Sequence, residues 1–173
     1  LDEAILAFKE ATSLNPNYSE AYNNLGNALK DQGKFGEAVD AYKKSILIRP
    51  NYTHAYYNMG IAYQEYGELT QAIEAFRKSI LLKPDYAEAY SNLGNTLQEL
   101  GELDKAIEAC KKALSLNPNY VEAFNNLGVA LRGQGKLDHA LNAFNKALAL
   151  DSDCAEVISN RAIAFQEQGK IDE

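Results

Sequence analysis

Hydrophobic and polar positions follow one another along the chain with the spacing of an α-helix. In residues 22–29 the packing positions show the i, i+3, i+4, i+7 pattern of one helix face. They are Tyr22, Leu25, Gly26 and Leu29. A second stripe with helical spacing follows after Gly33, at Ala38, Ala41, Tyr42, Ser45 and Ile46. The pattern therefore predicts two helices joined at Gly33, because glycine adopts the left-handed conformation in which helices end.

This pair of helices returns every 34 residues. The chain's four prolines mark the period, at Pro16, Pro50, Pro84 and Pro118. Nine of its eleven glycines fall in two registers, at 26, 60, 94 and 128 and at 33, 67, 101, 135 and 169. Neither helix of a pair hides its apolar stripe alone, so neighbouring pairs have to stack. We expect an all-α fold, a right-handed superhelical solenoid of antiparallel helix pairs with a concave and a convex side.

The period also predicts the domain organisation. Residues 1–173 form one solenoid, with a lone second helix in 1–18, complete repeats in 19–52, 53–86, 87–120 and 121–154, and a partial repeat in 155–173. Within each complete repeat a glycine lies inside the first helix, where it costs about 1 kcal/mol relative to alanine. Its recurrence predicts a packing role, in which another backbone approaches closely.

The repeat resembles the tetratricopeptide repeat (TPR) family. The family's pattern of aromatic, Leu-Gly, large, Ala, aromatic, Ala and Pro reads here as Tyr22, Leu25-Gly26, Leu29, Ala38, Tyr42, Ser45 and Pro50. The fifth unit departs from it at Ser152, Ile158, Arg161 and Ala162. The resemblance covers the whole chain and implies the solenoid fold. It implies a binding scaffold but names no partner, because such repeats serve many.

One polar position is shared by all five first helices and is not required by helix packing. It holds Asn24, Asn58, Asn92, Asn126 and Asn160. Asparagine is a poor residue for a helix interior, because its amide competes with the backbone for hydrogen bonds. On a concave face the five amides would form a ladder, and each could pair with a peptide group of an extended chain. Asn27 and Asn95, one turn further on, would widen it.

Such a ladder is similar to that in the repeat arm of O-linked N-acetylglucosamine transferases, which holds extended substrate peptides. This likeness extends to the five asparagine positions only. The alternative is that each asparagine bonds its neighbouring helix and serves packing.

Charge indicates the kind of ligand. The formal net charge is −7, without the basic stripe that a phosphate backbone needs, so nucleic acid is not expected as a partner. The face that carries the asparagines is acidic, with Glu20, Glu88 and Glu122 as candidate contacts, and further carboxylates at Asp31, Glu65, Glu99, Glu156 and Glu167 against only Lys30 and Arg132. A basic or neutral extended segment is favoured, although scattered charge is also typical of a solvated helix face.

Nothing in the sequence points to catalysis, a metal or a cofactor. The only histidines, His54 and His139, lie in different repeats, and every register glycine is explained by the repeat. Cys110 stands where other repeats carry an aromatic residue, so we expect it to be a small core residue. The two cysteines form no disulfide framework, which favours a reduced, cytoplasmic setting. No apolar run approaches the roughly 20 residues of a membrane span.

The sequence thus favours a non-enzymatic protein–protein interaction scaffold that binds an extended peptide in its groove. Two alternatives stay open: the substrate-recognition arm of a larger enzyme such as a glycosyltransferase, and a self-assembling structural scaffold. The second rests on apolar stripes without a partner in the chain, at Ala4, Ile5, Phe8 and Ala11 and at Ile158, Ala162 and Phe165. They predict head-to-tail self-association, in which one molecule completes the repeat of the next.

Overall fold

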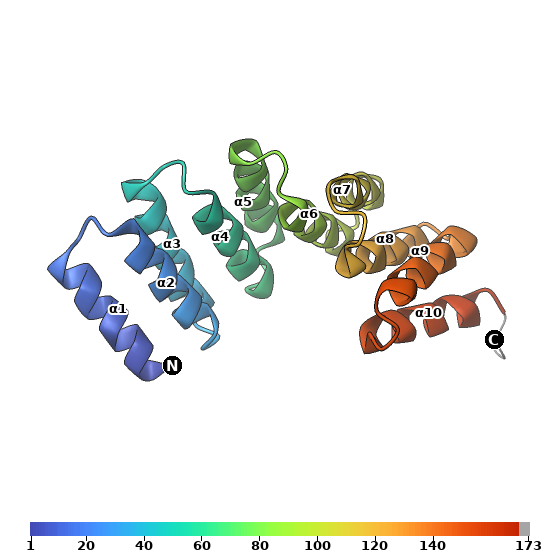
Figure 1. The fold of residues 1–173 in the computed structure, drawn as a ribbon, viewed down its shortest axis with the longest axis horizontal. Coiled ribbons are helices and arrows are strands. Elements are labelled where there is room, and N and C mark those ends of the chain that lie inside the picture. Colours follow the sequence, from blue (N-terminus) through green and yellow to red (C-terminus); the bar gives the residue numbers. More distant parts are fainter. Residues whose placement is uncertain (170–173) are drawn as a thin grey trace. The chain divides into compact units, whose positions relative to one another are not determined.

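The computed structural model describes residues 1–169, so the part of the partial repeat at 170–173 lies outside the described residues. The described chain contains ten α-helices and no strand, which confirms the all-α helical repeat fold (Figure 1). The helices are α1 (Asp2–Leu14), α2 (Ser19–Lys30), α3 (Phe35–Ile48), α4 (Thr53–Glu65), α5 (Leu69–Leu82), α6 (Ala87–Glu99), α7 (Leu103–Leu116), α8 (Val121–Gly133), α9 (Leu137–Leu150) and α10 (Ala155–Glu167).

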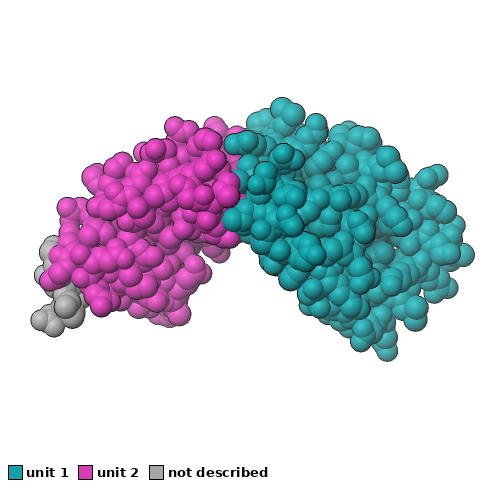
Figure 2. Space-filling model, turned by 180° about the vertical axis from the view of Figure 1, so that it is seen from behind, with its two compact units in different colours: residues 1–84 teal, residues 85–173 magenta. Residues whose placement is uncertain are grey.

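The helices divide into two compact units, distinguished by colour in Figure 2. Unit 1 spans Leu1–Pro84 and holds α1 to α5, and unit 2 begins at Asp85 and holds α6 to α10. Within each unit every helix packs against the next one in the chain. First helices also contact one another, α2 with α4 in unit 1 and α6 with α8 and α8 with α10 in unit 2.

The predicted turns at the glycines are confirmed. Gly33, Gly67, Gly101, Gly135 and Gly169 are the residues with positive φ, between 73° and 84°, in the described chain. At the first of them the amide of Lys34 donates to the carbonyl of Leu29 (2.9 Å), the bond that closes a helix end through a left-handed residue. The second helix then starts almost at once, which holds it antiparallel to the first.

The atoms nearest to the in-helix glycines belong to a side chain of the following second helix. A Cβ added to Gly26 would lie 2.5 Å from a ring carbon of Tyr42, and one on Gly60 or Gly128 would meet the ring of Phe76 or Phe144. At these three glycines the nearest neighbours are therefore ring atoms, and a close backbone stays a prediction. It holds in part at Gly94, where the added Cβ would lie 2.5 Å from Cys110 Sγ and 3.2 Å from the carbonyl oxygen of Ala106.

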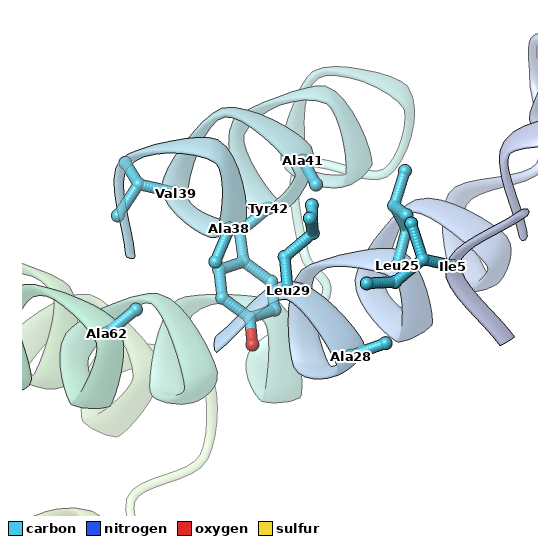
Figure 3. Close-up of a cluster of buried hydrophobic side chains, with 9 residues drawn as sticks. All are labelled: Ile5, Leu25, Ala28, Leu29, Ala38, Val39, Ala41, Tyr42 and Ala62. Atoms are coloured by element: carbon cyan, nitrogen blue, oxygen red, sulfur yellow. The ribbon is translucent and has the colours of Figure 1, made fainter. Parts of the chain in front are cut away.

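These rings lie at the centre of the core. Tyr42, Phe76 and Phe144 are fully buried, and so is Cys110 at the same position, as predicted. Figure 3 shows the cluster around Tyr42, to which α1, α2, α3 and α4 each contribute. Tyr42 and Phe144 thus each pack between their own first helix and the next first helix of the same unit.

Candidate functional site

The five predicted asparagines lie on first helices, at one position of each. We call them the Asn row: Asn24 and Asn58 in unit 1, and Asn92, Asn126 and Asn160 in unit 2. Asn24 is exposed and the other four are half-buried. Each unit carries its own segment of the row.

Most amides of the row donate to the preceding first helix of the same unit. Asn58 Nδ2 donates to Asn23 Oδ1 (3.2 Å), and Asn160 Nδ2 donates to Asn125 Oδ1 (3.0 Å). Asn126 Nδ2 donates to Ser91 Oγ (3.1 Å). The interhelical bonds weighed as the alternative therefore exist, and the packing role is part of what these side chains do.

These bonds use one end of each amide. Within the described residues the Oδ1 atoms of Asn58, Asn126 and Asn160 accept no hydrogen bond. A side-chain amide has two acceptor lone pairs on this oxygen. The bond through Nδ2 fixes the orientation of the amide, so the row presents oriented acceptors that suit a backbone N–H donor.

The acceptors of these bonds were not anticipated. Asn23, Ser91 and Asn125 each precede a row asparagine by one position and are buried. Small polar residues at this buried position in several repeats could have indicated a polar contact between helices. The second repeat interrupts the pattern, because it holds Tyr57 at that position.

Asn27, predicted to widen the row, has a structural task. Its Oδ1 accepts a hydrogen bond from the buried Tyr42 hydroxyl (2.8 Å). Burial, with the nearby Asp31 and Glu65 carboxylates, raises the pKa of Tyr42 above its usual value, so the hydroxyl stays protonated and donates. Two other repeats carry apolar residues at both positions, Ile61 with Phe76 and Val129 with Phe144.

Asn95 differs, because its repeat holds Cys110 at the position of Tyr42, and cysteine has no hydroxyl to donate. Its Nδ2 donates instead to Glu99 Oε1 (3.0 Å) on the surface of α6. Burial raises the pKa of the Cys110 thiol to about 12, so this thiol is no nucleophile.

The three predicted acidic contacts differ in their exposure and in whether they have a partner. Glu20 is partly exposed and its Oε1 accepts from Arg49 Nη1 (2.8 Å). Glu88 and Glu122 are exposed and make no ion pair or hydrogen bond within the described residues. The carboxylates of Glu88 and Glu122 are therefore the ones available to a cationic ligand.

Other kinds of site find no support in the described chain. Residues 1–169 hold no group of His, Cys, Asp and Glu that could bind a metal ion. In the same residues, no helix has the length and apolar character that crossing a membrane requires.

Helix pairs stacked at a 34-residue period, with oriented polar side chains on the first helices, define the class of α-helical repeat scaffolds. Within that class the chain belongs to the tetratricopeptide repeat family. The family's sequence model described as "Tetratricopeptide repeat" matches residues 87–120 and 121–154, and the one described as "TPR repeat" matches 1–33, 26–67 and 65–101. No curated protein sequence matches the chain.

Solved structures of TPR proteins share the fold over nearly the whole chain. The crystal structure of MamA is 35% identical with a TM-score of 0.81, covering 90% of this chain and 91% of MamA's. YrrB, described as a TPR protein with an unusual peptide-binding site, is 25% identical with a TM-score of 0.75, covering 96% of this chain and 86% of its own. TTC0263, a thermophilic TPR protein from Thermus thermophilus, is 27% identical with a TM-score of 0.77, covering 95% and 90%.

Proposed function

We propose that this chain is a non-enzymatic protein-interaction scaffold that binds an extended peptide along the Asn row. The observation that carries the proposal is the set of unused Oδ1 acceptors on Asn58, Asn126 and Asn160, each held by its own Nδ2 bond. Backbone N–H groups of an extended segment are the complementary donors, and they are present in every peptide sequence. The description of YrrB as having a peptide-binding site supports a ligand of this kind.

The ligand is expected to be basic or neutral. Glu88 and Glu122 are exposed on the same helices as the row and lack a partner within the described residues. Asn95 contributes through the amide that already bonds Glu99, whereas Asn27 is occupied by Tyr42. Binding of a Lys- or Arg-containing peptide should weaken with added salt, since exposed charges are screened over about 10 Å at 0.1 M.

The test is a library of unstructured peptides, from which binders are selected and their affinities measured by titration. The double variant N58A/N126A removes one row asparagine from each unit. The matched control, N23A/S91A, removes side-chain acceptors of the same interhelical bonds and leaves the row intact. Because a hydrogen bond contributes about 0.5–1.5 kcal/mol, two lost ligand bonds predict roughly tenfold weaker binding in N58A/N126A.

N23A/S91A should lose less affinity, because it loosens the amides of the row but keeps their Oδ1 acceptors. Equal loss of affinity in the two double variants would mean that the asparagines act only through the interhelical bonds. Tighter binding of acidic than of basic peptides would contradict the expected charge of the ligand.

A role as the recognition arm of a larger enzyme would use the same row and give the same result in this test. Self-assembly is a separate candidate, but the prediction that its apolar stripes lack a partner in the chain is wrong for three residues. Ile5 and Phe8 pack in the cluster around Tyr42, and Phe165 packs against the cluster around Phe144. The candidate now rests on exposed apolar residues of α1 and α10, among them Leu6 (69% exposed) and Ile158 (42%). A protein of residues 1–173 would then grow in size with concentration, and I158E would keep it monomeric. A strict monomer at high concentration in light scattering would exclude self-assembly of this chain.

A further inference from the structure

Three of the repeats share a polar contact that joins successive pairs. A glutamine in the turn after a first helix donates from Nε2 to the Oδ1 of an aspartate at the start of the preceding second helix. We call this contact the Asp–Gln bridge. It joins Asp2 to Gln32 (2.6 Å), Asp104 to Gln134 (2.7 Å) and Asp138 to Gln168 (2.5 Å).

Between α3 and the turn that follows α4, both partners of the bridge are replaced. Gly36 stands in the place of the aspartate and Tyr66 in the place of the glutamine. A Cβ added to Gly36 would meet no atom within 4 Å, so this side of α3 is open. Tyr66 is 58% exposed and its ring packs against Phe35, with ring centroids 6.4 Å apart.

The replacement leaves a pocket within unit 1. Its volume is about 340 Å³, and we call it the Gly36 pocket. Two aromatic rings, two carboxylates and an amine line it: Tyr63, Tyr66, Asp40, Glu68 and Lys43. A volume of 300 Å³ or more is typical of sites that enclose a small ligand or a large side chain.

The charges of this pocket favour a cation. The carboxylates of Asp40 and Glu68 are exposed and make no hydrogen bond or ion pair within the described residues, whereas Lys43 supplies one positive charge. Lys43 Nζ lies over the ring of Tyr63 at 5.9 Å from its centroid, close to the limit of about 6 Å for a cation–π contact. The ring of Tyr63 thus already faces the ammonium group of Lys43, which lies at the outer limit of this contact on a flexible side chain.

We propose that the Gly36 pocket binds an arginine side chain of a partner protein. A planar guanidinium stacks on tyrosine faces and donates several hydrogen bonds in fixed directions, which suits two carboxylates beside two rings. The pocket shares no residue with the Asn row: Tyr63 follows Asn58 by five positions, about 140° around α4. The proposal therefore does not depend on peptide binding at the row.

The test uses the whole chain labelled with ¹⁵N and titrated with N-acetyl-L-arginine amide. N-acetyl-L-citrulline amide, which has nearly the same shape without the charge, is the control ligand. We expect saturable shifts of the Gly36 and Tyr66 amides, with citrulline binding about tenfold more weakly because the cation–π and charge contributions are lost. The same titration with N-acetyl-L-lysine amide distinguishes a guanidinium from any cation.

Two variants locate the site. G36D/Y66Q introduces the Asp–Gln bridge found three times in the chain, so it should fold and bind arginine about tenfold more weakly as the stacking ring is lost. Should it fold poorly, Y66L places the residue of the next repeat, Leu100, at this position. K43Q should tighten arginine binding, because it removes the competing positive charge.

Loss of affinity in K43Q would show that the pocket takes an anion and would overturn the proposal. Equal affinities for arginine and citrulline, unchanged binding in both Tyr66 variants, or the absence of saturable shifts at Gly36 would do the same.

Discussion

At the scale of the residue, the repeat depends on a glycine that faces a ring. At Gly60 the nearest carbon of Phe76 would lie 2.6 Å from an added Cβ, a distance that real Cβ atoms do not show. The ring is fully buried and has little freedom to move. The glycine is therefore required by sterics, while its conformation is that of an ordinary helix.

Two helical glycines of unit 1 should respond to alanine with opposite signs. G60A should lower the free energy of unfolding by about 1–3 kcal/mol, because it overpacks the core against Phe76. G36A should raise it by up to about 1 kcal/mol, because the added Cβ meets no atom and restricts the unfolded chain. Urea denaturation measures both, and a stabilising G60A would contradict the ring contact.

The pair of Asn27 and Tyr42 offers a second residue-scale test. N27V should cost about 1–3 kcal/mol, because the Tyr42 hydroxyl stays buried without its acceptor. N27V/Y42F copies the pair Val129 and Phe144 and should recover most of that loss. A double-mutant cycle in thermal or urea unfolding gives the coupling, and additive effects of the two changes would contradict it.

At the scale of the element, the helices, their turns and their order could be predicted from the sequence. Five copies of one pattern confirm one another, and left-handed glycines such as Gly33 mark each turn without ambiguity. The partners of polar side chains could not be predicted, because they depend on how neighbouring helices are rotated. The bond from Asn58 to Asn23 and the Asp–Gln bridges belong to this class. The in-helix glycines show the same limit, since a missing Cβ does not say whether a ring or a backbone fills the space.

The candidate site was predicted in position but only partly in role. Asn24, Asn58, Asn92, Asn126 and Asn160 fall on first helices as expected, because the period alone fixes their place. Asn27 has a role that was not predicted, since its Oδ1 accepts the hydrogen bond of the buried Tyr42 hydroxyl. Peptide binding by the row itself stays a prediction.

At the scale of the whole molecule, stability should be distributed along the chain. A repeat protein gains its stability from each single repeat and from the contacts between neighbouring repeats. Helices with fewer neighbours are therefore held less firmly. In unit 1 the buried residues of α1 are only Ile5 and Thr12, and in unit 2 those of α10 are only Val157 and Ala164. By contrast, α3 and α9 each bury five residues, including the core rings Tyr42 and Phe144.

We therefore expect native-state hydrogen exchange to rank the helices of each unit. Amides of α1 and α10 should exchange through local opening at low free-energy cost, and those of α3 and α9 only through larger unfolding events. The variant I5A weakens the contact of α1 with α2 and α3. It should therefore speed amide exchange in α1 far more than in α9. If all ten helices instead exchanged with one common free energy, the chain would unfold as a single cooperative block, and the additive picture of repeat stability would not describe it.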